Sequence, residues 1–234
     1  MFGGVPTVYG IDPSQTETSP SHGLGTLGLT PDGRKFRYAR AGEALVAGTL
    51  TQAAAEDTVD QGITPTAAAI GDRTITTSST VTVTNGQYND GYMVITITPG
   101  LGHIYKIKSH GAATAAALTF SLYDPIRVAL TTTTRFDFVA NPYAAVIINP
   151  TTATGMVTGV AFVAAANQAY TWIQTGGVAS ILSDGATAVG TQVVASNGTA
   201  GAVEDVASTT QAVIGIALSG ITTAENGPVF LILD

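Results

Sequence analysis

The sequence predicts an all-β fold, a sandwich or barrel-like arrangement of short antiparallel strands. Three observations lead to this prediction. Apolar and polar residues alternate with period two in many short segments, most clearly in residues 117–123. Turn pairs such as Asn85-Gly86, Asp184-Gly185 and Asn226-Gly227 recur between these segments. No sustained 3.6-residue periodicity appears after residue 61, so no helix is expected there.

The chain begins with a segment unlike the rest. Residues 1–33 are rich in Gly, Pro, Ser and Thr, and residues 12–21 show no apolar periodicity. We expect an extended N-terminal arm over 1–33, either ordered by contact with a neighbouring molecule or disordered. The first residues lack the basic and apolar stretches of a secretory signal peptide, so synthesis in the cytoplasm is expected.

The first strand is expected at 36–41, after the turn Pro31-Asp32-Gly33. Residues 52–61 have the highest helix propensity in the chain. At most one short helix is expected there, because a helix of about ten residues is only marginally stable by itself. The segment 74–99 has the clearest β pattern. Alternating residues flank the hairpin turn Asn85-Gly86, and a strand over 92–98 follows.

Four further strands are expected before residue 150, at 103–110, 117–123, 135–139 and 144–148. In the first of them, Ile104, Lys106, Lys108 and His110 would mostly face solvent, and Tyr105 would lie on the other side. The later strands end at Asp-Pro or Asn-Pro pairs, because the residue before proline disfavours the helical region and favours a turn.

Six short strands are expected in the remainder, at 157–163, 170–175, 178–182, 192–195, 212–218 and 229–233. This gives two β domains, 34–150 and 151–234, which can also pack as one unit. Residues 42–50 resemble residues 185–193, since both read as a glycine, a short apolar stretch, a glycine and a strand. The similarity indicates either an internal duplication or two generic β-turn-β segments.

Charge is scarce and unevenly distributed. Charged residues make up 11 % of the 234 residues, against about 25 % in an ordinary soluble domain. All nine Lys and Arg lie between Arg34 and Arg135, and the formal net charge is −7. Residues 136–234 contain no cation, so contacts with nucleic-acid phosphates are not expected from them. No apolar run is long enough to span a membrane, and the absence of cysteine excludes disulfides.

The titratable residues form no recognisable catalytic pattern. His103 and His110 are seven residues apart, so on a straight strand they point to opposite faces, and His22 lies in the arm. Neither a Gly-x-Ser-x-Gly motif nor a P-loop is present. We therefore expect a non-enzymatic protein without cofactor or metal. The carboxylate pairs considered for a glycosidase are Asp57 with Asp60, Asp124 with Asp137, and Glu204 with Asp205.

One cluster of cations stands out as a candidate interface with a partner protein. It consists of Arg34, Lys35, Arg37 and Arg40, and alternation would place Lys35 and Arg37 on one side of the strand. Three aromatic residues, Tyr105, Phe120 and Trp172, are candidate anchors of a core or of an interface.

Several stretches resemble structural proteins encoded beside the head genes of tailed bacteriophages. They are residues 33–38, 102–110, 122–126, 141–143 and 172–179, so the resemblance covers roughly residues 33–234. The C-terminal part, 184–234, is similar in style to small decoration proteins that sit on capsid lattices. The resemblance transfers no catalytic residue. It implies a capsid decoration role, with a symmetric homo-oligomer, a trimer or a dimer.

The expected function is therefore that of a decoration or cement protein, made in the host cytoplasm and bound to the outer surface of the virion head. Its expected partners are the major capsid protein lattice and further copies of itself, with no nucleic acid and no membrane. A tail, baseplate or fibre-associated binding protein is the alternative, followed by a glycan-acting enzyme.

Overall fold

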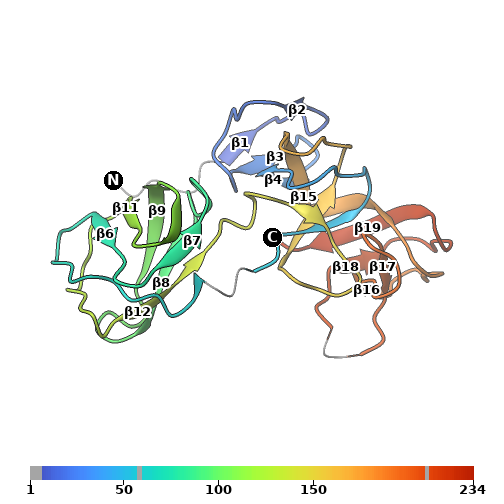
Figure 1. The fold of residues 1–234 in the computed structure, drawn as a ribbon. Coiled ribbons are helices and arrows are strands. Elements are labelled where there is room, and N and C mark those ends of the chain that lie inside the picture. Colours follow the sequence, from blue (N-terminus) through green and yellow to red (C-terminus); the bar gives the residue numbers. More distant parts are fainter. Residues whose placement is uncertain (1–6, 57–59, 209–210) are drawn as a thin grey trace. The chain divides into compact units, whose positions relative to one another are not determined.

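The protein is all-β, which confirms the predicted fold class (Figure 1). The computed structural model describes residues 7–56, 60–208 and 211–234. Over these residues the sheets do not close into a barrel, so the sandwich-like form of the prediction is the one supported. The chain divides into two compact units. Unit 1 comprises Met1–Ala55 and Pro142–Asp234, and unit 2 comprises Glu56–Asn141.

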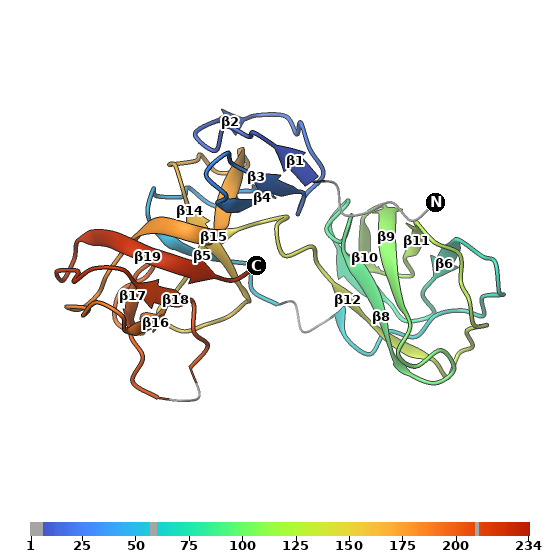
Figure 2. The ribbon, with the colours of Figure 1, turned by 180° about the vertical axis from the view of Figure 1, so that it is seen from behind.

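Unit 1 is built on one sheet, whose main path runs β1-β3-β4-β15-β19-β18-β16-β17. Its longest strand, β15, pairs with β4 along its first half and with β19 along its second half (Figures 1 and 2). The strands are β1 (Thr7–Tyr9), β2 (Thr16–Glu17), β3 (Leu27–Leu29), β4 (Lys35–Arg40), β5 (Leu50–Gln52), β13 (Ile147–Ile148), β14 (Val157–Ala161), β15 (Tyr170–Leu182), β16 (Gln192–Ala195), β17 (Val203–Asp205), β18 (Gly215–Ala217) and β19 (Asn226–Ile232).

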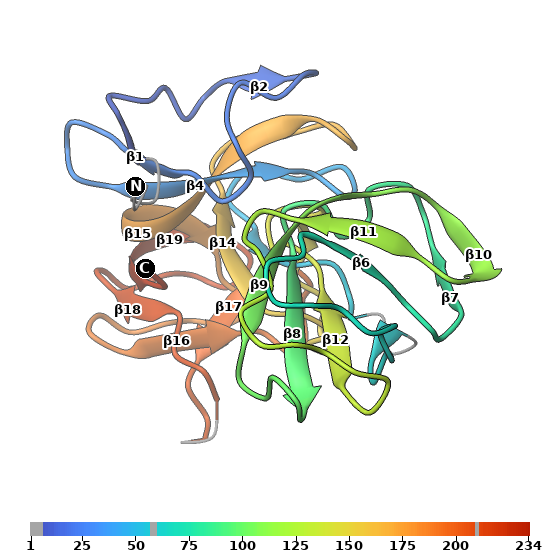
Figure 3. The same ribbon diagram turned by 90° about the vertical axis from the view of Figure 1, so that its left-hand side faces the viewer.

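Unit 2 contains a five-stranded sheet of order β12-β8-β9-β11-β6 and a separate pair, β10-β7. In Figure 3 strand β8 runs between β9 and β12. The strands are β6 (Thr74–Thr76), β7 (Val81–Val83), β8 (Tyr92–Ile97), β9 (Ile104–His110), β10 (Ala113–Ala116), β11 (Thr119–Leu122) and β12 (Arg135–Val139).

Unit 2 is an insertion in unit 1, and this differs from the expected domain boundaries of 34–150 and 151–234. Strand β5 precedes the insertion and pairs with β13 and β14, which follow it. Strand β4 likewise pairs with β15, more than a hundred residues later. Turn residues report local breaks in the chain, whereas these pairings join segments far apart in sequence.

The expected N-terminal arm is part of the sheet of unit 1 over the residues that the structure describes. Strand β3 pairs with β4, β1 pairs in parallel with β3, and β2 pairs with the start of β15. Val8, Ile11 and Leu24 pack against a buried aromatic cluster of Phe36, Tyr38 and Trp172. The segment is therefore ordered within its own chain from residue 7 onward, and residues 1–6 lie outside the described part.

The described residues of 52–61, where at most one short helix was expected, form no α-helix. Gln52 ends β5, and residues 53–56 are irregular. Residues 57–59 lie outside the described residues. The backbone of Gln52 and Ala53 is paired with strand β14 and Met156, so the sheet satisfies hydrogen bonds that a helix would otherwise make.

The similarity between 42–50 and 185–193 corresponds to a repeated turn. Residues 41–50 and 183–192 each lead from a strand end through a buried residue (Leu45, Thr187) and a glycine of positive φ (Gly48, Gly190) into a new strand. Residues 161–170 and 217–226 follow the same path. Their positive-φ residues are Gln168 and Ala224, which conceals the repeat in the sequence.

The four turns associate as two reciprocal pairs. Leu45 and Ala165 exchange both backbone hydrogen bonds, as do Thr187 and Ile221. The positive-φ residue of each turn also donates its N–H to the first residue of its partner: Gly48 to Ala161, Gln168 to Ala41, Gly190 to Ala217 and Ala224 to Ser183. Each pair thus has an approximate internal two-fold arrangement, and the same arrangement occurs in both pairs.

The cores explain where the three candidate aromatic anchors lie. Tyr105 and Phe120 are buried in the core of unit 2, where Phe120 makes ring contacts with Phe136 and Phe138. Trp172 is 5 % exposed and packs edge-on against Tyr38 beneath the N-terminal segment. All three side chains therefore anchor cores of their own units rather than open surfaces.

The repeated turn yields a stability prediction. Ala224 has φ +62°, a conformation that costs an alanine roughly 1–2 kcal/mol and a glycine almost nothing. We expect Ala224→Gly to raise the free energy of unfolding by about 0.5–1 kcal/mol, after subtracting the greater freedom of glycine in the unfolded chain. Urea unfolding followed by the fluorescence of Trp172, the single tryptophan, reports on unit 1.

Gly48→Ala is the matched control, because Gly48 occupies the same position of another turn. Its φ is +75°, and an added Cβ would lie 2.0 Å from Nδ2 of Asn226, so this variant is expected to be less stable. A fall in the unfolding midpoint of Ala224→Gly would contradict the proposed equivalence of the turns.

Candidate interaction surfaces

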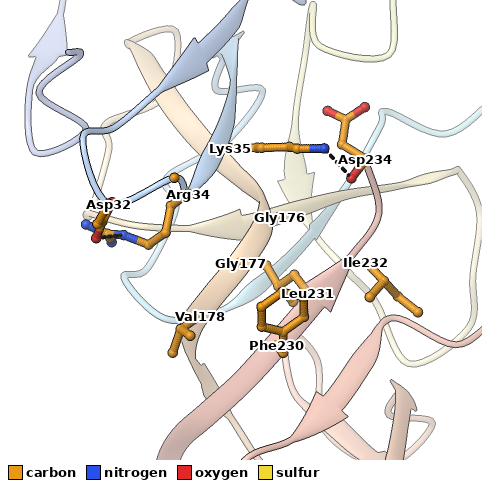
Figure 4. Close-up of a pocket in the computed structure, with 11 residues that line it drawn as sticks. Asp32, Arg34, Lys35, Gly176, Gly177, Val178, Phe230, Leu231, Ile232 and Asp234 are labelled. Carbon is orange, nitrogen blue, oxygen red and sulfur yellow. Dashed lines mark hydrogen bonds and ion pairs between the residues drawn. The ribbon is translucent and has the colours of Figure 1, made fainter. Parts of the chain in front are cut away.

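A shallow groove of about 520 Å³ lies where β15 bends at Gly176 and Gly177 (Figure 4). The stem of Lys35 crosses Gly176, and the stem of Arg34 crosses Gly177, which has φ +81°. An added Cβ at either glycine would come within 3.1–3.2 Å of these stems. The buried Gln174 amide donates to the carbonyls of Gly176 and Val178, so the bend is held by its own chain.

The cationic cluster predicted as an interface is used largely within the chain. Arg37 donates through Nε and Nη2 to the two carboxylate oxygens of Asp234, at 2.6 and 2.8 Å. Arg34 pairs with Asp32 at 2.8 Å, and Arg40 donates to the carbonyl of Ala144. Lys35 donates to the main-chain oxygen of Asp234, as the dashed line in Figure 4 marks. Lys35 and Arg37 do lie on one side of the strand, since both reach Asp234.

The Arg37–Asp234 pair is the best-formed ion pair among the described residues. Its hydrogen bonds lower the pKa of Asp234 below the usual value of 3.8, and nearby Lys35 adds to this effect. The same hydrogen bonds raise the pKa of Arg37. The two side chains are 20–23 % exposed, so the pair fastens the end of β19 to β4 and Thr175.

An apolar face lies beside the groove, and we call it the β15–β18 face. Val178, Phe230 and Ile216 are directly opposite one another across β15, β19 and β18, so their side chains share one side of the sheet. Ile232 and Leu218 continue it at alternate positions. These five side chains are 39–51 % exposed, whereas the intervening Ala179, Leu231 and Ala217 are buried in the core of unit 1.

Unit 2 has a comparable surface, which we call the β8–β12 face. Val139, Tyr92 and Lys106 are directly opposite across β12, β8 and β9, and Ile104 lies next to Lys106 on the same side. Tyr123 joins them, with its ring centroid 5.5 Å from Lys106 Nζ. The four apolar or aromatic side chains are 38–60 % exposed. Asp90 accepts from Tyr123 Oη at 3.0 Å and pairs with Lys106 at 3.6 Å.

The histidines lie in separate environments. His22 contacts Tyr38 and Trp172 in unit 1, and His103 stacks on Tyr105 in unit 2. His110 was expected to face solvent with Lys106, but it is buried, because an irregular register between β9 and β11 turns it inward. There its Nε2 accepts the N–H of Tyr88 at 2.9 Å, and its Nδ1 lies 2.7 Å from the carbonyl oxygen of Gly111.

Three of the carboxylates considered for catalysis, Asp60, Asp137 and Asp205, accept local hydrogen bonds. Asp60 accepts from Tyr88 Oη at 2.5 Å in the core of unit 2, and Asp57 lies outside the described residues. Asp137 accepts the N–H of Gly62, and Asp205 accepts from Thr191. Over the described residues, no group of three His, Asp or Glu side chains is placed to hold a metal ion. That part of the chain also contains no helix long and apolar enough to cross a membrane.

No protein-family model, curated protein or solved structure matches the chain.

Neither apolar face was predicted from the sequence, although one sequence pattern indicated the β15–β18 face. Residues 228–233 read Pro-Val-Phe-Leu-Ile-Leu, a continuous apolar run rather than an alternation. Such a run predicts a strand that is covered on both sides. In unit 1 one side is covered by the core, and the other is the exposed β15–β18 face.

The lowered pKa of Asp234 predicts how stability depends on pH. A carboxylate whose pKa is depressed in the folded state stabilises the fold above its unfolded pKa, and this contribution is lost as the pH falls through the folded value. We expect Asp234→Asn to cost about 1 kcal/mol at pH 7, and the difference from wild type to shrink below about pH 4. Urea unfolding at pH 7, 5, 4 and 3 measures it.

Glu225→Gln serves as the control, because Glu225 is an exposed acid of unit 1. Its effect should be small at every pH. An Asp234→Asn penalty that stays constant from pH 7 to pH 3 would contradict an ionised Asp234–Arg37 pair as its source.

Proposed function

We propose that the chain is a non-enzymatic structural protein of a tailed-phage virion, a decoration protein that binds the outer surface of the head and stabilises it. The observation that supports this best is that each unit exposes an apolar face on an otherwise well-packed sheet. Contiguous apolar surface of this kind is typical of proteins whose faces are covered in an assembly. The head location in this proposal rests on the resemblance of residues 33–234 to head-associated structural proteins that the sequence suggests.

The scarcity of charge supports the same proposal. Arg37 and Arg34 are paired with Asp234 and Asp32 within the chain, so these two cations of the expected basic patch are already engaged. A protein that has few charges and exposes Val, Ile, Phe and Tyr is better suited to dry contacts than to electrostatic capture. Weak contacts of this sort gain strength when a lattice repeats them.

We assign the contact with the major capsid protein lattice to the β8–β12 face of unit 2. It combines exposed Tyr92 and Tyr123 with Ile104 and Val139, the mixture of aromatic and aliphatic side chains that protein interfaces favour. Lys106 and Asp90 pair beside Tyr123 and add polar contacts near the rim. This assignment replaces the Arg34–Arg40 segment as the proposed lattice contact.

One observation favours the second candidate, a tail or fibre-associated binding protein. Tyr92 and Tyr123 are exposed on either side of Lys106, with the Asp90 carboxylate in reach of Lys106 and Tyr123. Exposed aromatic rings with adjacent polar groups can also receive a sugar ring. Location in the virion separates the two candidates, since decoration implies many copies on the head and a fibre role implies few copies on the tail.

The proposal predicts the effect of a charge on the β8–β12 face. Ile104→Asp should reduce the number of copies bound to purified heads at least about tenfold, because a buried apolar contact and a desolvated carboxylate together cost more than ~1.4 kcal/mol. Ile70→Asp is the matched control, since Ile70 is an isoleucine of unit 2 that is 69 % exposed outside this face. Sedimentation of labelled protein with heads, and separately with tails, measures occupancy.

The proposal is supported if the protein binds heads saturably and if Ile104→Asp weakens this binding while Ile70→Asp does not. Binding confined to tails favours the second candidate, and binding to neither particle overturns the virion role. Equal loss of binding in both variants would place the lattice contact on another surface.

A further inference from the structure

The β15–β18 face of unit 1 has opposite charges at its two ends. Lys35 on β4 is opposite Gly176, which is opposite Ile232 on β19, so Lys35 lies on the same side of the sheet as the apolar residues. The Lys35 stem passes 3.2–3.4 Å from the position of a Cβ on Gly176, which agrees with this placement. Lys35 therefore marks the β4 end of the face.

The other end of the face is acidic. Ile216 is opposite Gln192 on β16, and Val194, two residues further on, is opposite Glu204 on β17. Residues two apart on a strand share a side, so Glu204 lies on the same side of the sheet as Phe230 and Ile216, beyond the buried Val194. Five strand spacings separate β4 from β17, which is about 24 Å in a flat sheet.

These end charges are not matched by side-chain ion pairs within the described part of the chain. Asp234 pairs with Arg37, and Lys35 donates a hydrogen bond to the main-chain oxygen of Asp234. Glu204 makes no ion pair with any described residue. The face thus carries a cation at one end, an anion at the other and five exposed apolar side chains between them.

We propose that this face binds a second copy of the chain. A two-fold axis parallel to the strands, lying between two such faces, places the β4 end of each copy over the β17 end of the other. The apolar residues of the two β15–β18 faces then contact each other. Each Lys35 lies opposite Glu204 of the partner copy, so one interface contains two Lys35–Glu204 pairs. The alternative two-fold, perpendicular to the strands, would oppose Lys35 with Lys35 and Glu204 with Glu204, which is unfavourable.

This self-association is independent of the head location, because it uses unit 1 and the proposed lattice contact uses unit 2. It also accounts for the position of the two glycines in β15. A side chain at Gly176 would displace Lys35 from the end of the face, and Gly177 gives Arg34 its place beside it.

The first experiment tests the apolar strip by measuring the mass of the purified protein by analytical ultracentrifugation between about 1 and 100 µM. Wild type is expected to form a dimer, and Val178→Asp is expected to weaken it at least tenfold. Val46→Asp is the matched control, since Val46 is also an exposed valine of unit 1, 55 % exposed, and lies outside the face. The Trp172 fluorescence of each variant checks that unit 1 stays folded.

The second experiment tests the charge pairing. Lys35→Glu and Glu204→Lys should each weaken the dimer several-fold, and the double variant should recover most of the loss, because the swap restores opposite charges at each contact. Raising the salt concentration should reduce the single-variant penalties, since exposed charges are screened.

A wild-type chain that stays monomeric at 100 µM overturns the proposal, as does a dimer that Val178→Asp leaves unchanged. A double variant no better than the worse single variant overturns the two-fold arrangement. Neither result bears on the binding of the protein to heads, which Ile104→Asp tests separately.

Discussion

The reciprocal hydrogen bonding of the repeated turns is the constraint on which unit 1 depends. Each turn leaves one strand, presents a buried residue to its partner turn and enters the next strand with a positive-φ residue. Because the partner supplies the missing acceptors, neither turn of a pair is satisfied alone. One pair sets β4 and β5 against β14 and β15, and the other sets β15 and β16 against β18 and β19. The long strand β15 belongs to both pairs and therefore joins the two halves of the sheet.

Much of the strand pattern could be predicted from local residues, because alternation and turn chemistry act over a few positions. Residues 117–123 and 135–139 became strands of unit 2, with Phe120, Phe136 and Phe138 in its core. The long-range pairings could not be predicted in this way. Nothing within residues 1–33 indicates that Leu27–Leu29 would pair with β4, or that Val8 and Leu24 would cover Trp172.

The candidate site shows the same limit. The alternation of Lys35 and Arg37 correctly placed both side chains on one side of the strand, but their partner, Asp234, is about two hundred residues away. The side chain of His110 points inward because β9 pairs with β11 in an irregular register. No pattern in residues 103–110 predicts this irregularity. The exposed faces follow from which strands become neighbours, so they emerge only when the register of β15, β19 and β18 is known.

The insertion of unit 2 has a consequence for how the chain folds. Ile63 and Phe136, near the two ends of the insertion, exchange backbone hydrogen bonds, and Gly62 also donates to Asp137. Once unit 2 has folded, the connection between β5 and β13 behaves as a short tether instead of a flexible loop of about ninety residues. The folding of unit 2 therefore already covers most of the loop-closure entropy cost of bringing β5 to β13. We therefore expect unit 2 to form early and to act as an internal folding aid for the sheet that surrounds it in sequence.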